Sequence, residues 1–108
     1  MELRTLEERL ARLQGQYREI EENFGGMSKA EFVSSRHLFE RAEQDSDRLS
    51  GLIVQDATEF QHELILSLNA DSSRSMFDAI DRLTQIVIGV VKADRSHNDW
   101  LINRLVSF

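Results

Sequence analysis

The sequence predicts an all-α protein in which three helices pack antiparallel and two of them form a long hairpin. Three observations predict this fold: the 108-residue chain has no proline, it has only five glycines, and its apolar residues recur at intervals of three and four. A chain without proline can sustain long, uninterrupted helices. We expect a single domain, 1–108, with helices over about 2–24, 28–69 and 72–107.

The 2–24 helix has the most regular pattern. Its apolar residues alternate spacings of three and four, which is a heptad seam, and they are Leu3, Leu6, Leu10, Leu13, Tyr17, Ile20 and Phe24. Gly25 and Gly26 are expected to end the helix, because glycine readily adopts the backbone conformation of a helix C-terminus. A parallel pair of such helices would bring Glu2 against Glu7. We therefore expect this helix to pack on its own chain.

The 28–69 helix begins with a recognisable cap. Ser28 and Glu31 form an S-x-x-E capping box, which satisfies backbone N–H groups at a helix start. A stripe follows that is apolar except at Ser46, consisting of Phe32, Phe39, Ala42, Ser46, Leu49, Ile53, Ala57, Phe60, Leu64 and Leu68. Gly51 is a possible break, since glycine costs about 1 kcal/mol inside a helix. The stripe keeps its phase beyond Gly51, which favours one continuous helix.

The 72–107 helix follows a polar turn over residues 69–73, where Asp71 or Ser72 is the expected N-cap. The run Ile86–Val91 is rich in β-branched residues and would suit a buried strand. No second candidate strand exists to pair with it. A buried helix is therefore the better interpretation.

Folding the 2–24 helix back about the two glycines predicts which residues face each other. Leu13 would lie opposite Phe39 and Leu3 opposite Leu49, so residues 52–91 would form a two-helix arm. Two helices cannot bury apolar residues that surround both of them. The residues expected to need another cover are Leu52, Val54, Ile65, Leu66, Ile86 and Ile88.

A second copy of the chain is the expected cover, and it would complete a four-helix layer across a two-fold axis. Gly89 and Ala93, four residues apart, would allow a close helix crossing there. An amphipathic helix of another protein is the alternative occupant.

The C-terminal segment carries a second cluster of apolar residues, Trp100, Leu101, Leu105 and Phe108. One interpretation is a helix end that packs on Phe39 and Leu13. The other is a docking segment for another protein, because aromatic anchors are frequent in interfaces.

Composition excludes several function classes. The formal net charge is −6 and no basic stripe is present, which argues against nucleic-acid binding. The longest apolar run is far shorter than the ~20 residues of a membrane span. Cysteine is absent, and no signal-peptide core follows Met1. These features favour a cytoplasmic protein that is not an enzyme and needs no cofactor, since no catalytic spacing is present.

Two pairs of an acidic residue and a histidine, spaced as in E-x-x-H, would be compatible with metal binding. Glu59 with His62, and Asp94 with His97, have the spacing of metal ligands in ferritin-like bundles. The predicted register keeps the pairs apart, so we interpret all three histidines, including His37, as solvated.

The favoured function is a non-enzymatic interaction module, such as an adaptor, an assembly factor or a chaperone-like accessory subunit. It would act as a homodimer or on a helical or basic client protein. A metal-binding bundle and a small regulatory protein that acts through a partner are the alternatives.

Overall fold

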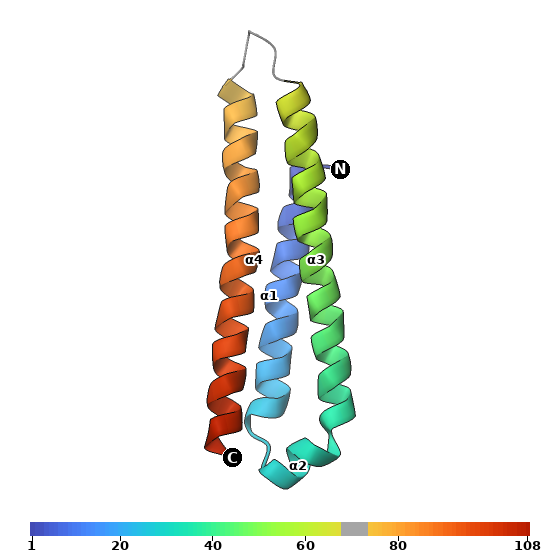
Figure 1. Ribbon diagram of the computed structural model, residues 1–108, viewed down its shortest axis with the longest axis vertical. Coiled ribbons are helices and arrows are strands. Elements are labelled where there is room, and N and C mark those ends of the chain that lie inside the picture. Colours follow the sequence, from blue (N-terminus) through green and yellow to red (C-terminus); the bar gives the residue numbers. More distant parts are fainter. Residues whose placement is uncertain (68–73) are drawn as a thin grey trace.

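The computed structural model describes residues 1–67 and 74–108. Three long helices lie side by side over their shared length: α1 (Leu3–Gly25), α3 (Arg36–Leu66) and α4 (Arg74–Ser107). The short helix α2 (Lys29–Ser34) crosses one end of the bundle (Figure 1). α1 and α4 run in the same direction and α3 runs opposite to both, within an elongated molecule of 62 × 19 × 16 Å. The prediction of an all-α fold is confirmed for the described residues.

Several local predictions are also confirmed. Ser28 caps α2, and its hydroxyl oxygen accepts a hydrogen bond from the backbone N–H of Glu31 at 3.3 Å. α3 continues without a break through Gly51, whose surroundings are open. Residues 86–91, which might have formed a strand, are helical. The predicted turn at 69–73 and its N-cap lie outside the described residues.

The 28–69 helix is not continuous, and its break falls at Ser35 and not at Gly51. The backbone N–H of Ser35 donates to the carbonyl oxygens of Glu31 at 3.0 Å and Phe32 at 3.1 Å, which closes α2. Serine competes for backbone hydrogen bonds and weakens helices. The break turns Phe32 across the end of the bundle, where its ring lies 5.1 Å from that of Phe39.

This corner makes the predicted α1–α3 register wrong. Gln16 accepts a hydrogen bond from Ser46 at 3.3 Å, and Arg9 forms an ion pair with Asp56. The predicted register placed Gln16 near residue 36. Because α2 and its two connections occupy residues 26–35, α1 extends about three turns further along α3 than a simple hairpin allows.

α1 also packs against α4, so all three long helices share one core. The buried apolar residues come from all four helices and are Leu6, Leu13, Tyr17, Ile20, Phe24, Phe32, Phe39, Leu49, Ile53, Ala57, Leu83, Ile86 and Val90. The expectation that residues 52–91 form an arm of only two helices is therefore wrong for much of that arm. α1 covers it as far as Ala57 on α3 and Leu83 on α4.

Candidate functional site

The three grooves between the long helices differ in chemistry. The α1–α3 groove is lined mainly by polar side chains, among them Gln16, Asp45 and Arg48. The α1–α4 groove is also polar, with Arg18 and Lys92. The outer groove between α3 and α4 is lined by Ala57, Thr58, Gln61, Leu83, Thr84, Val87 and Ile88. No charged residue lines it.

Further apolar residues extend this groove along both helices. Val54 precedes Thr58 by one helical turn, and Ile65 follows Gln61 by one turn, so both lie on the same side of α3. On α4, Val91 lies one turn from Ile88. We call the surface formed by Val54, Ile65, Ile88 and Val91 the α3–α4 outer face. All four side chains are exposed.

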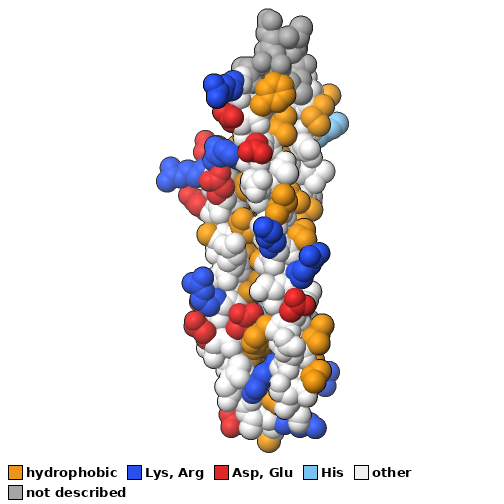
Figure 2. Space-filling view, turned by 90° about the vertical axis from the view of Figure 1, so that its left-hand side faces the viewer, with side chains coloured by type: hydrophobic (Ala, Val, Ile, Leu, Met, Phe, Trp, Pro, Cys, Tyr) orange, Lys and Arg blue, Asp and Glu red, His pale blue; other side chains and the backbone are white. Residues whose placement is uncertain are grey.

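Figure 2 shows the molecule from the side of α4. Hydrophobic side chains lie along the right-hand side of that view and at its upper end, next to the residues that are not described. Charged side chains gather mainly on the left. The separation is clearest in the upper half of this view, and further down charged and hydrophobic side chains are mixed.

Five of the seven residues predicted to meet a partner are exposed, and they lie in three places. Val54, Ile65 and Ile88 belong to the α3–α4 outer face. Leu66, at the end of α3, is 71% exposed. Leu52 is 43% exposed, but it lines the α1–α3 groove and so faces away from the others.

Two of the predicted interface residues instead serve the internal packing of the chain. Ile86 is only 3% exposed, because α1 covers the side of α4 that the sequence analysis left open. Gly89 does permit a close helix crossing, but the crossing helix is α1. A Cβ atom on Gly89 would lie 2.6 Å from Cδ2 of Leu10.

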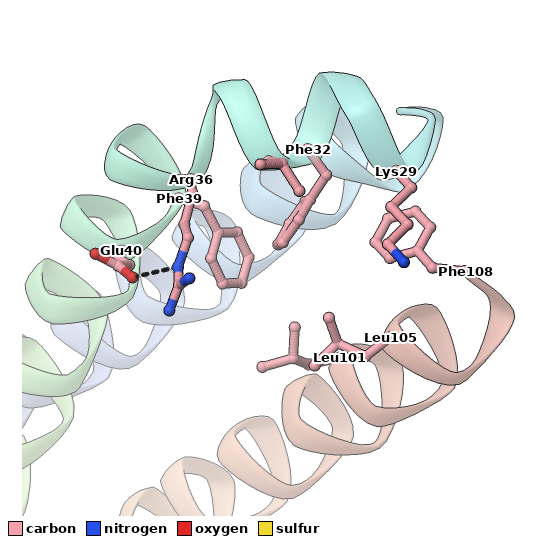
Figure 3. Close-up of a pocket in the computed structure, with 9 residues that line it drawn as sticks. Lys29, Phe32, Arg36, Phe39, Glu40, Leu101, Leu105 and Phe108 are labelled. Carbon is pink, nitrogen blue, oxygen red and sulfur yellow. Dashed lines mark hydrogen bonds and ion pairs between the residues drawn. The ribbon is translucent and has the colours of Figure 1, made fainter.

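The end of the bundle carries a second apolar hollow, which we call the end groove. It has a volume of about 440 Å³ and lies between α2, the first turns of α3 and the last turns of α4 (Figure 3). Its lining residues are Lys29, Phe32, Val33, Arg36, Phe39, Glu40, Leu101, Leu105 and Phe108.

The C-terminal apolar residues fall on two sides of α4. Trp100 approaches Gly25 of α1, to within 3.7 Å of a Cβ placed there, and it is partly buried against the core. Leu101, Leu105 and Phe108 line the end groove. The ring of Phe108 lies 5.4 Å from that of Phe32. Trp100, Leu101 and Phe108 thus pack partly on the core, as the helix-end interpretation expects, while Leu105 is exposed.

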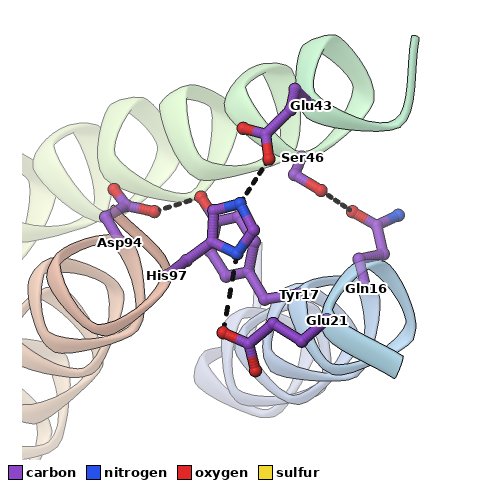
Figure 4. Close-up of polar contacts among 7 residues, drawn as sticks. All are labelled: Gln16, Tyr17, Glu21, Glu43, Ser46, Asp94 and His97. Carbon is purple, nitrogen blue, oxygen red and sulfur yellow. Dashed lines mark hydrogen bonds and ion pairs between the residues drawn. The ribbon is translucent and has the colours of Figure 1, made fainter. Parts of the chain in front are cut away.

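A layer of polar residues crosses the middle of the bundle (Figure 4). The hydroxyl of Tyr17 in α1 donates to one carboxylate oxygen of Asp94 in α4 at 2.5 Å. The other oxygen of Asp94 accepts from Ser50 in α3 at 2.9 Å. One carboxylate therefore links all three long helices.

His97 is the second centre of this layer and is 2% exposed, so the expectation that it is solvated is wrong. Its Nε2 is hydrogen-bonded to Glu43, and a carboxylate oxygen of Glu21 lies 3.7 Å from Nδ1. The ring stacks on Tyr17 with centroids 4.4 Å apart. His37 and His62 are exposed, as predicted.

The environment of the layer disfavours negative charge. Burial raises the pKa of Tyr17 well above its ordinary value, and the hydrogen bond to Asp94 adds to the effect. The pKa of Asp47 is also raised, by partial desolvation and by the nearby carboxylates of Glu43 and Asp94, although its side chain is still exposed to solvent. The layer is thus a tightly coupled structural element that joins the helices.

A pattern in the sequence could have revealed this layer. Val90, Asp94, His97 and Leu101 are spaced by four, three and four residues, so Asp94 and His97 lie on the inward side of α4. Their polarity alone led to the expectation that both side chains face solvent. Buried polar groups are tolerated when partners satisfy their hydrogen bonds. Tyr17 and Ser50 do so for Asp94, and Glu43 does so for Nε2 of His97, whereas Nδ1 of His97 has no hydrogen-bond partner among the described residues.

Two other kinds of function would require a metal site or a membrane-spanning helix. No group of three or more His, Cys, Asp or Glu side chains in residues 1–67 and 74–108 is placed to hold a metal ion. No helix in the same part of the chain is both long and apolar enough to cross a membrane.

Comparison with known proteins adds no relative: no family model, no curated protein and no solved structure matches the chain.

Proposed function

We propose that the protein is an interaction module that pairs with a second copy of itself through the α3–α4 outer face. The supporting observation is the unequal chemistry of the three grooves. Two are lined by charged and polar side chains, while the third carries exposed Val54, Ile65, Ile88 and Val91. Exposed apolar surface of this kind is typical of protein–protein contacts.

The charge distribution supports a second copy as the occupant. The chain carries a net charge of −6, so most contacts between two copies would be repulsive. The lining of the α3–α4 groove contains no ionisable residue and adds no repulsion where the copies meet. Pairing two such faces about a two-fold axis would place α3 and α4 of each copy in a four-helix layer.

The length of the face is adequate for helix pairing. Val54 to Ile65 spans about 16 Å of α3 at ~1.5 Å per residue. This is three turns, the extent over which the anchors of one helix usually engage another. A dimer with these properties would act as an adaptor or accessory subunit.

The test is the mass in solution of Val91→Glu, measured by light scattering, with Leu52→Glu as the matched control. Leu52 and Val91 have similar exposures, 43% and 50%, but Leu52 lies outside the face. We expect a dimeric wild type, a dimeric Leu52→Glu and a monomeric Val91→Glu, all with equal helical circular dichroism. A monomeric wild type at high concentration contradicts the proposal, and so does equal dissociation of both variants.

A further inference from the structure

The end groove has the dimensions of a ligand site. Its volume of about 440 Å³ lies within the range of small-molecule pockets, which are mostly apolar with a few placed polar groups. Figure 3 shows the rings of Phe32 and Phe39 on one side and Leu101 and Leu105 rising from α4 on the other. Three separate helices build its walls, so the site depends on the corner at Ser35.

The charged groups of the groove leave one cation unpaired. Of the three charged lining residues, Arg36 donates to Glu40 at 2.8 Å, so these two charges offset each other. Within the described part of the chain, no carboxylate side chain is recorded in ion-pair contact with Lys29. Its ammonium group points from α2 toward the ring of Phe108, at the edge of the groove (Figure 3).

We propose that the end groove binds an amphiphilic carboxylate, with its alkyl chain among the phenylalanine and leucine side chains and its head group at Lys29. The one unpaired cation matches a ligand with one negative charge. The remaining lining is apolar apart from the Arg36–Glu40 pair. A ligand whose only polar group is its carboxylate therefore places no polar group of its own in the apolar part of the groove without a partner.

The wall around Phe108 is held in place by a separate contact. The guanidinium of Arg104 donates to the backbone carbonyl of Met27 and lies over the Phe108 ring, 4.6 Å from its centroid. This contact ties the end of α4 to the connection before α2. An extended peptide is a poorer occupant, because its backbone N–H and C=O groups would find few partners in this lining.

The experiment is an NMR titration of the whole chain with decanoate, and separately with decanol, which has the same alkyl chain without the charge. We expect saturable binding of decanoate that shifts the Phe32, Phe39 and Phe108 ring signals. Lys29→Ala should weaken decanoate binding about threefold to fivefold, the worth of an exposed ion pair. It should leave the weaker decanol binding unchanged, and the control Lys92→Ala, in the α1–α4 groove, should change neither.

Two further variants keep the test decisive. Leu105→Glu changes a half-exposed wall residue and should abolish binding of both ligands while the helices remain folded. Val91→Glu should bind decanoate as the wild type does, which separates this site from the dimer face. Three results overturn the proposal: no saturable binding, equal loss of affinity in Lys29→Ala and Lys92→Ala, or binding of an acidic helical peptide in place of decanoate.

Discussion

The close crossing of α1 and α4 at Gly89 gives a quantitative test of the structure. The sequence pattern predicts that this glycine contacts a partner chain, whereas in the structure Leu10 of α1 lies against it. A Cβ on Gly89 would come within 2.6 Å of Cδ2 and 3.4 Å of Cδ1 of Leu10. Gly51 of α3 has no atom within 4 Å of the same position and is the matched control.

Only one of the two substitutions to alanine should stabilise the chain. Alanine is favoured over glycine inside a helix by about 1 kcal/mol, so Gly51→Ala should stabilise the chain by about that amount. At Gly89 the same gain is opposed by overpacking, which typically costs about 1–3 kcal/mol. Leu10 is only partly buried and can shift. We therefore expect Gly89→Ala to range from neutral to about 2 kcal/mol less stable than wild type.

Denaturant unfolding of both variants measures the difference, and thermal unfolding should separate them by about 4 °C or more. The Leu10→Ala substitution completes a double-mutant cycle. Its coupling energy with Gly89→Ala should be about 0.5 kcal/mol or more, because the shortened side chain relieves the contact. If Gly89→Ala is as stabilising as Gly51→Ala and shows no coupling to Leu10, α1 does not cross α4 at this point.

Two predictions concern the polar layer. The raised pKa of Tyr17 means that stability is retained below pH ~10, the pKa of an unfolded tyrosine, and is lost as the pH rises further. Because Tyr17 is the only tyrosine, its tyrosinate absorbance should appear together with loss of helical circular dichroism; tyrosinate in a fully helical protein would contradict the burial. The raised pKa of Asp47 means that its charged form destabilises the fold above that pKa. Asp47→Asn should therefore be more stable than wild type at neutral pH, with the advantage shrinking as the pH falls through the Asp47 pKa; an advantage that does not vary with pH would exclude this cause.

The all-α fold could be predicted because its signals are local. The heptad of α1 and the Ser28–Glu31 cap depend on neighbours within one or two turns. The register between helices depends on where a connection bends. Nothing in the stripe that begins at Phe32 marks Ser35 as a break, since the stripe resumes at Phe39 in a compatible phase. A single misplaced corner then shifted the predicted α1–α3 contacts by about three turns.

The α3–α4 register illustrates a different limit. The predicted register sets the polar residues 94–98 opposite the polar residues 43–47, and the His97–Glu43 hydrogen bond confirms this. Both polar segments were expected to face solvent. Whether such a belt is buried depends on a third helix that supplies partners, and the predicted register placed residues 5–9 of α1 at this level instead of Tyr17. Tyr17 could not be assigned to Asp94 until the corner at Ser35 was known.

The same displacement of α1 narrows the surface available to a partner. Because α1 extends to Asp56 and Arg82, it buries Ile86 and occupies the crossing at Gly89. Apart from Leu52, which lines the α1–α3 groove, the exposed apolar residues Val54, Ile65, Ile88 and Val91 of the hairpin lie on the α3–α4 outer face, on the side that α1 does not cover. The proposed second copy would therefore lie along this face. Pairing through one such strip explains why a charge at Val91 should dissociate the copies while the same charge at Leu52 should not.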